Sequence, residues 1–154
     1  MRPHCSDFLR ELSAIAEVII FTASSPSYAD VVLDYLDPHK RFFSHRLYRQ
    51  HCTLEKGFYT KDLRCVNRRL EDCVLVDNSG FSIMLQPDNG IPILPYYHFN
   101  KDRELLSLLD FLRELIKFDD MREKVRSHFF WHKYLSSDAD PKKIFQENFC
   151  KEQK

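Results

Sequence analysis

The stretch VLVDNSG, residues 74–80, decides the fold class of this chain. Three apolar residues run directly into an acid, an amide, a hydroxyl and a glycine. A buried parallel strand has this form when its carboxyl end opens onto a binding site. A strand followed by an ordinary Asx-type turn has the same form. The neighbouring segments therefore have to decide between the two interpretations.

The segments before this stretch favour a parallel α/β sheet. A helix is expected over residues 6–16, with Ser6 or Asp7 as its N-cap and apolar residues at helical spacing. A β-branched strand is expected over residues 17–24, and a second helix over residues 26–38, ended by its proline. Helix, apolar strand and helix in this order begin a parallel α/β sheet.

The rest of the chain continues in the same way. We expect a short irregular strand pair over residues 41–60 and a helix over residues 61–70, followed by the strand of the opening stretch over residues 73–77. A short last strand is expected over residues 91–94 and a leucine-rich helix over residues 102–118. The strand pair has a turn signal at Lys56-Gly57. The chain has 154 residues, which indicates one domain with a sizeable core.

Composition argues against several other classes of protein. Basic and acidic residues both number 23, so no overall charge points to nucleic acid or to an anionic membrane. Three glycines, without a phosphate-loop or dinucleotide pattern, argue against those nucleotide sites. Five widely spaced cysteines with no C-x-x-C argue against a disulfide scaffold and a zinc ribbon, and favour a reducing intracellular compartment. We expect no membrane-spanning segment, because no apolar run is long enough.

Polar side chains follow two of the expected strands and begin one expected helix. Thr22 and Ser24 follow the apolar residues VIIF of the first strand, Lys61 begins the helix, and Asp77-Asn78 follows the apolar residues VLV of the opening stretch. Because the carboxyl ends of parallel strands meet at one crevice, these groups are expected to converge. A hydroxyl, an ammonium, a carboxylate and an amide suit a phosphate group and a hard divalent cation such as Mg²⁺.

The order and spacing of these residues resemble a known family. Three segments are similar to motifs II, III and IV of the haloacid dehalogenase superfamily, in its branch of carboxy-terminal-domain (CTD) phosphatases, which includes the small CTD phosphatases and the Dullard/Nem1 phosphatases. The three segments are FTAS (21–24), YTKDL (59–63) and VDNS (76–79). The resemblance also rests on RPHCSDFL (2–9), SYAD (27–30), RLYRQHCTLEKGFYTKDL (46–63) and PDNGIPI (87–93).

The resemblance implies a three-layer α/β/α Rossmannoid domain over residues 1–130, followed by a charged tail over residues 131–154. It also implies a catalytic role for three residues and a metal role for two. Thr22 would bind the transferred phosphoryl group, and Lys61 would pair with the phosphate and with the carboxylate of the nucleophile. Asn78 would be a ligand of Mg²⁺, while Asp77 would lie beside the metal and orient Lys61.

The substrate-binding residues implied by the resemblance lie on either side of this site. Ala23 and Ser24 would present backbone N–H groups beside the phosphoryl group, and Tyr28 and Arg49 would line the substrate groove. The implied substrate is a protein phosphorylated on serine or threonine, such as the C-terminal tail of RNA polymerase II, and not nucleic acid. The implied location is the nucleus, or the nuclear envelope and endoplasmic reticulum.

One motif of the family has no match at the expected place. Its nucleophile and its acid/base are two aspartates in a D-x-D-x-[TV] motif at the end of a central strand. The sequence Asp138-Ala139-Asp140-Pro141 has the spacing but follows no apolar strand, so we do not expect it to be catalytic. We expect a gap in the sheet between the strands ending near Thr22 and at Asp77, with the first strand missing from this chain.

These observations lead to a functional expectation with two alternatives. We expect a truncated piece of a Mg²⁺-dependent protein serine/threonine phosphatase that works through an aspartyl-phosphate and is inactive alone, because the nucleophile lies outside this chain. An inactive phosphoprotein-binding or scaffolding module is one alternative. A relative of the mitochondrial import subunit with the same fold is the other. Cys52 is interpreted as a packing residue and not as a nucleophile.

Overall fold

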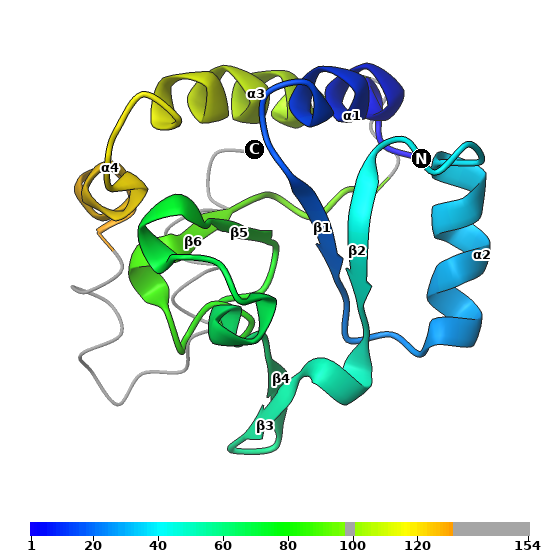
Figure 1. The fold of residues 1–154 in the computed structure, drawn as a ribbon, viewed down its shortest axis with the longest axis horizontal. Helices are drawn as coiled ribbons and strands as arrows, with labels where there is room; N and C mark the ends of the chain where they lie inside the picture. Colours follow the sequence, from blue (N-terminus) through cyan, green and yellow to red (C-terminus); the bar gives the residue numbers. More distant parts are fainter. Residues whose placement is uncertain (98–100, 131–154) are drawn as a thin grey trace.

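The computed structural model describes residues 1–97 and 101–130, which combine helices with short strands (Figure 1). The helices are α1 (Cys5–Ser13), α2 (Pro26–Leu36), α3 (Glu104–Leu115) and α4 (Met121–Phe129). The strands are β1 (Val18–Phe21), β2 (Phe43–Leu47), β3 (Thr53–Glu55), β4 (Phe58–Thr60), β5 (Leu75–Asp77) and β6 (Gly90–Pro92). Short 3-10 turns are η1 (Arg49–His51), η2 (Leu63–Val66), η3 (Leu70–Asp72) and η4 (Pro87–Asn89).

The first half of the chain forms a strand–helix–strand unit. Strands β1 and β2 pair in parallel, with Ile19 beside His45, and α2 lies between them in the sequence. Helix α2 begins at Pro26, whose fixed φ and missing N–H are tolerated in the first turn, and it ends at Leu36, two residues before Pro38. This unit confirms the expected parallel α/β arrangement.

The prediction of a single strand pair over residues 41–60 is wrong in its first part. Only β3 and β4 pair with each other, in antiparallel register around the turn at Lys56-Gly57, whereas β2 joins β1. The buried carboxylate of Asp37 explains the difference. It accepts hydrogen bonds from three consecutive backbone N–H groups, those of residues 41, 42 and 43, at 2.7, 2.8 and 3.2 Å. These bonds turn the chain after α2 and direct it back along β1.

The strand of the opening stretch pairs with the short last strand. Strands β5 and β6 run in parallel, with Val76 beside Ile91, so both belong to the same layer. The N–H of Ile93 donates to the carbonyl of Asp77 at 3.1 Å and continues the pairing to the end of β5. Residues 74–80 therefore form a parallel strand followed by a polar loop, as predicted.

The two parallel strand pairs do not hydrogen-bond to each other. Within the described residues, β1 pairs with β2 and β5 with β6, as two separate two-stranded sheets (Figure 1). The four apolar side chains of β1, Val18 to Phe21, are only half-buried, and none belongs to the clusters of buried residues that form the core. An apolar strand inside a complete sheet is normally covered on both sides. Strand β1 is therefore only half covered, and β5 pairs with β6 alone among the described strands.

Helices α1, α3 and α4 pack on the main hydrophobic core. This core contains Leu115 and Val125, both fully buried, and extends to Ile91 in β6. The other buried members of the core are Phe8, Leu9, Leu105, Leu108, Leu109 and Leu112. The leucine-rich helix expected over residues 102–118 is α3, and its leucines form the largest share of this core.

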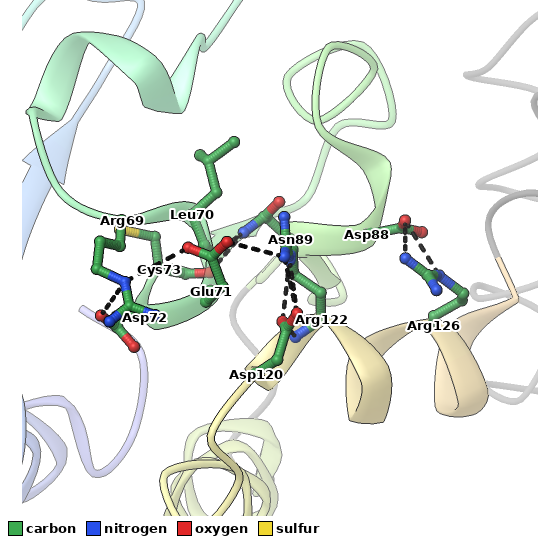
Figure 2. Close-up of polar contacts among 10 residues, drawn as sticks. All are labelled: Arg69, Leu70, Glu71, Asp72, Cys73, Asp88, Asn89, Asp120, Arg122 and Arg126. Atoms are coloured by element: carbon green, nitrogen blue, oxygen red, sulfur yellow. Dashed lines mark hydrogen bonds and ion pairs between the residues drawn. The ribbon is translucent and has the colours of Figure 1, made fainter.

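Helix α4 is attached to the turns that lead into β5 and β6 (Figure 2). The Arg122 guanidinium pairs with Asp120 at 2.7 Å and with Glu71 at 3.1 Å, and Arg126 pairs with Asp88 at 2.6 Å. Since Glu71 belongs to η3 and Asp88 to η4, one helix fixes the entry to both strands.

A buried asparagine completes this attachment. The Asn89 amide donates to the carbonyls of Leu70 and Cys73 at 2.6 and 2.8 Å and joins the two turns directly (Figure 2). The start of β5 is therefore held on both sides, which in turn fixes where the strand ends.

Two expected helix details are wrong. Helix α1 starts at Cys5 after His4, which has a positive φ of 64°, so neither Ser6 nor Asp7 is its N-cap. Residues 61–70 contain the short 3-10 turn η2 and the first residue of η3 instead of a helix. Asp62 caps the first turn by accepting from the N–H of Arg64, and Asn67 ends that turn with a positive φ of 53°. These local side-chain hydrogen bonds compete with the helix.

The described residues include no helix that is long and apolar enough to cross a membrane. The expected boundary between the domain and the tail at residue 130 stays a prediction, because residues 131–154 lie outside the described residues. The Asp138–Asp140 pair lies in that part too.

Candidate active site

A buried ion pair forms the centre of the candidate site. Lys61 follows β4, and its backbone N–H is held by the carbonyl of Ser82 at 3.0 Å. Its ammonium group donates to Oδ2 of Asp77, the last residue of β5, and the two side chains are 11% and 8% exposed. The other carboxylate oxygen of Asp77 accepts from the N–H of Ser79 at 2.8 Å. Sequence analysis placed Lys61 and Asp77 at one crevice, and the structure brings them into direct contact.

Asn78 lies next to this pair at the edge of a cavity. Its side chain is exposed, and the cavity of about 270 Å³ is lined by Asp77, Asn78, Arg2 and residues 93–96. Oxygen donors beside a space that admits water are the surroundings that Mg²⁺ prefers, because this ion keeps several of its waters. Within the described residues, no group of three or more His, Cys, Asp or Glu side chains could hold a metal ion. The residues present therefore fit part of a Mg²⁺ site, and further oxygen ligands have to complete it.

Arg2 closes one wall of the cavity, which sequence reasoning missed. Its guanidinium donates to both carboxylate oxygens of Asp102, at 2.8 Å each, and to the carbonyl of Leu94 at 2.7 Å. The hydrogen bonds from Arg2 hold the pKa of Asp102 below its usual range. The two residues lie 100 positions apart, so no local pattern could have indicated this pair.

Thr22 follows β1 and begins a tight turn. Its N–H continues the pairing with β2 by donating to the carbonyl of Leu47 at 2.9 Å, and its hydroxyl oxygen accepts from the N–H of Ser24 at 3.1 Å. The N–H of Ser24 therefore points at the hydroxyl of Thr22. The loop after β1 is held in a defined shape.

Cys52 lies near both parts of the site. Its sulfur contacts the carbonyl of Thr22 at 3.8 Å, and the charges of Lys61 and Asp77 act on its pKa. Burial raises the pKa of Cys52, while Lys61 lowers it to a lesser degree. The side chain therefore remains a thiol at neutral pH, which agrees with a packing role.

The structure connects Arg49 to the residues after Thr22. The Arg49 side chain donates to the carbonyl of Ala23 at 2.6 Å, and its backbone N–H donates to the carbonyl of Ser24 at 3.0 Å. Tyr28 lies on the first turn of α2 and is 68% exposed. Tyr59, which sequence reasoning placed in the YTKDL motif without giving it a role, has its ring under the Arg49 guanidinium at 5.4 Å. Its position two residues before Lys61 on a strand is the signal that could have indicated it. The functional roles of these residues stay predictions.

The parallel strand pairs, and the polar groups gathered at their ends, define a haloacid-dehalogenase-like α/β domain. Solved structures with the same fold support this class. The structure of Fcp1, described as an essential RNA polymerase II CTD phosphatase, has a TM-score of 0.55 at 20% identity and covers 94% of this chain and 40% of that one. The fission yeast Fcp1 variant bound to beryllium fluoride has a TM-score of 0.54 at 19% identity, covering 96% of this chain and 46% of that one.

Residues 1–122 match the family described as NLI interacting factor-like phosphatase, and the chain belongs to this family. It is 46% identical to a probable C-terminal domain small phosphatase of Dictyostelium discoideum over 121 residues, which are 79% of this chain and 39% of that protein. It is 40% identical to CTD nuclear envelope phosphatase 1 of Xenopus laevis over 132 residues, 86% of this chain and 54% of that protein. The chain thus spans about half or less of these relatives. These matches confirm the resemblance to the CTD phosphatases.

Proposed function

We propose that this chain forms the phosphate-binding half of a Mg²⁺-dependent protein serine/threonine phosphatase that works through an aspartyl-phosphate. The observation that carries the proposal is the buried Lys61–Asp77 ion pair, which lies beside Asn78 at the end of β5. A buried ion pair contributes little to stability, because removing both charges from water costs about as much as their attraction returns. Its place at a strand end beside a cavity is better explained by a reaction that needs both charges.

Each residue of the half-site has a proposed task. Lys61 offsets the negative charge of the phosphoryl group in the transition state, and the hydroxyl of Thr22 donates a hydrogen bond to a phosphoryl oxygen. Asn78 and Asp77 would hold the metal and its waters, and a bound Mg²⁺ would offset the charge of the phosphate. The described residues contain no D-x-D pair that could supply the nucleophile and the acid/base.

The nucleophile is proposed to come from a strand that fits between β1 and β5. The first carboxylate of its D-x-D-x-[TV] motif attacks phosphorus and releases the substrate hydroxyl, which takes a proton from the second aspartate. Water then cleaves the acyl phosphate and restores the carboxylate. The same strand would pair with β5 and cover the half-buried side chains of β1.

The proposed substrates are proteins phosphorylated on serine or threonine, with the C-terminal tail of RNA polymerase II among them. A human relative, 38% identical over 125 residues, is named as a small phosphatase of that polymerase domain. The exposed Tyr28 and Arg49 leave the rim of the site open to a peptide chain. The name of the Xenopus relative supports a location in the nucleus or at the nuclear envelope and endoplasmic reticulum.

Restoring the missing strand tests this proposal. An apolar strand ending in D-x-D-x-T is joined in front of Met1, and hydrolysis of p-nitrophenyl phosphate is measured with Mg²⁺ and with a chelator. We expect Mg²⁺-dependent turnover, no turnover with N-x-N in the same strand, and a loss of about a hundredfold or more for Lys61→Met. Arg126→Gln, far along the chain in α4, is the control that should keep full activity.

A rise in thermal stability without turnover would contradict the enzymatic proposal, since the strand would then have completed the fold but not a catalytic site. Binding of a phosphopeptide by that same inactive protein would favour a non-catalytic phosphoprotein-binding module.

A further inference from the structure

The β3–β4 hairpin carries an exposed apolar surface next to the candidate phosphate site. Leu54 and Tyr59 are direct cross-strand partners, so their side chains share one face of the hairpin. They are 64% and 43% exposed. Lys61 follows Tyr59 by two positions, and Figure 1 shows the hairpin projecting from the body of the molecule. The Leu54–Tyr59 surface therefore lies next to Lys61 of the candidate site.

The opposite face of the hairpin is anchored to the domain. The ring of Phe58 stacks on Phe81 with centroids 3.8 Å apart and an angle of 8° between the rings. Thr60 is fully buried, and its hydroxyl donates to the carbonyl of Thr53 at 3.0 Å. The Phe58–Phe81 stack holds the hairpin against the domain, and the Thr60–Thr53 hydrogen bond links its two strands, so the Leu54–Tyr59 surface is presented in a fixed orientation.

Arg49 joins this surface to the loop after β1. Its guanidinium lies over the Tyr59 ring at 5.4 Å and donates from Nε to the carbonyl of Ala23 at 2.6 Å. Its two terminal nitrogens make no hydrogen bond to the described residues, and the side chain is exposed. The face of an aromatic ring attracts a cation electrostatically, so the guanidinium and the ring hold each other in place. Arg49 thus fixes the ring and still offers two donors to a peptide.

We propose that Leu54 and Tyr59 form a subsite for an apolar side chain of the phosphoprotein substrate. This inference rests on the proposed function, because continuity with the phosphate site identifies the occupant. Successive residues in a strand are about 3.3 Å apart, and cross-strand partners have Cβ atoms about 5 Å apart. Tyr59 therefore lies about 7 Å from Lys61 along the strand, and its cross-strand partner Leu54 lies about 8 Å from Lys61. An extended peptide reaches it two or three residues from its phosphorylated residue.

A leucine scan of phosphopeptides tests the subsite. Fluorescent peptides carry one phosphoserine in a Gly/Ser/Ala background, with a single leucine moved through each flanking position on both sides. Their affinity for this chain is measured by fluorescence anisotropy in buffer that contains Mg²⁺, and inorganic phosphate is the competitor. We expect leucine at one position, two or three residues from the phosphoserine, to tighten binding about fivefold compared with serine.

Substitutions assign the gain to the hairpin. Leu54→Ser should abolish the leucine preference but leave binding of the leucine-free phosphopeptide unchanged, since its backbone and the phosphate site remain. Ile116→Ser is the matched control, because Ile116 is 46% exposed and lies at the end of α3, away from the hairpin (Figure 1). This variant should keep the full preference.

Three outcomes would overturn the subsite, and they separate it from the proposed function. A wild-type chain with no positional preference, or a preference that survives Leu54→Ser, would overturn the subsite alone. In both cases the proposed function stands if the protein with the added D-x-D-x-T strand hydrolyses p-nitrophenyl phosphate. If the chain binds no phosphopeptide at all, the subsite and the phosphate site fail together.

Discussion

Substituting either Lys61 or Asp77 alone should lower the free energy of unfolding. Substituting both residues should lower it by less than the sum of the two single losses. The side chains are 11% and 8% exposed, so each substitution leaves the other charge largely out of water. Breaking a buried pair by removing one partner typically costs about 3–5 kcal/mol.

The structure distinguishes the two single variants. In Lys61→Met, Asp77 keeps the hydrogen bond from Ser79 and faces a cavity of about 270 Å³ that admits water. We therefore expect a loss of about 2 kcal/mol in the free energy of unfolding. In Asp77→Leu, the ammonium of Lys61 has no other acceptor among the described residues, so the loss should be about 3 kcal/mol or more.

The double variant Lys61→Met/Asp77→Leu removes both charges and should lose only about 2 kcal/mol, which gives a coupling of about 3 kcal/mol. Urea unfolding followed by circular dichroism measures all four proteins, and equal slopes confirm that they unfold from comparable native states. The exposed pair Glu114–Lys117 in the same protein is the control and should show no measurable coupling. Additive losses at Lys61 and Asp77, within about 0.5 kcal/mol, would refute the reasoning.

Three further predictions concern the scaffold around the site. Burial raises the pKa of Asp37, but hydrogen bonds from the N–H groups of 41–43 outweigh it and hold this pKa below its ordinary value. The ionised carboxylate of Asp37 therefore stabilises the fold at pH values above the ordinary pKa of an aspartate, and this stabilisation is lost as the pH falls through the lowered pKa. Asp37→Ala should cost about 3 kcal/mol at neutral pH and flatten the acid limb of the stability profile measured by urea unfolding. Gly90→Ala should cost about 1–3 kcal/mol, because the new Cβ would lie 2.7 Å from Cδ1 of Ile83, and Ile83→Val in the same protein should recover part of the loss. Arg126→Gln should leave the midpoint of urea unfolding unchanged, because its ion pair is exposed to solvent, and a clear drop would contradict this.

The sequence predicted the parts of the fold that depend on local signals. The β-branched run of β1, the proline that begins α2 and the apolar run of β5 each have a pattern that holds without tertiary contacts. The leucine spacing of α3 identified its buried face, which forms much of the core. In each of these segments, periodicity and the tertiary environment favour the same element.

Elements that depend on distant or side-chain contacts were harder to predict. Strand β2 pairs with β1 because Asp37 turns the chain, and a single buried carboxylate gives no periodic pattern. The stretch after Lys61 has helix-forming residues, but capping by Asp62 and the positive φ of Asn67 divide it into turns. Local hydrogen bonds determine the pairing of β2 and the turns after Lys61, and helix or strand propensities do not predict such bonds.

The candidate site was likewise predicted only in part. Lys61 and Asp77 were expected at one crevice from the ends of their segments, and they are in contact. Neither the Arg2–Asp102 pair, which closes the cavity, nor the Arg49–Tyr59 contact was predicted. The first joins two residues that lie 100 positions apart in the sequence. The Arg49–Tyr59 contact depends on which residues of β3 and β4 pair with each other. The sequence, with two aromatic residues directly after the turn, does not specify this pairing.

The charges of the half-site give a physical reason for the proposed need for a metal. In the structure, the charge of Lys61 is already neutralised by Asp77. A phosphate monoester brings up to about two further negative charges near neutral pH, and the buried carboxylate of Asp77 would repel them at close range. Arg49 is exposed and held by Ala23, so solvent screens its contribution. A divalent cation beside Asp77 and Asn78 would offset the carboxylate and free Lys61 to act on the phosphate. The proposed metal dependence would then follow from the charge of a buried pair that repels an anion unless a cation binds next to it.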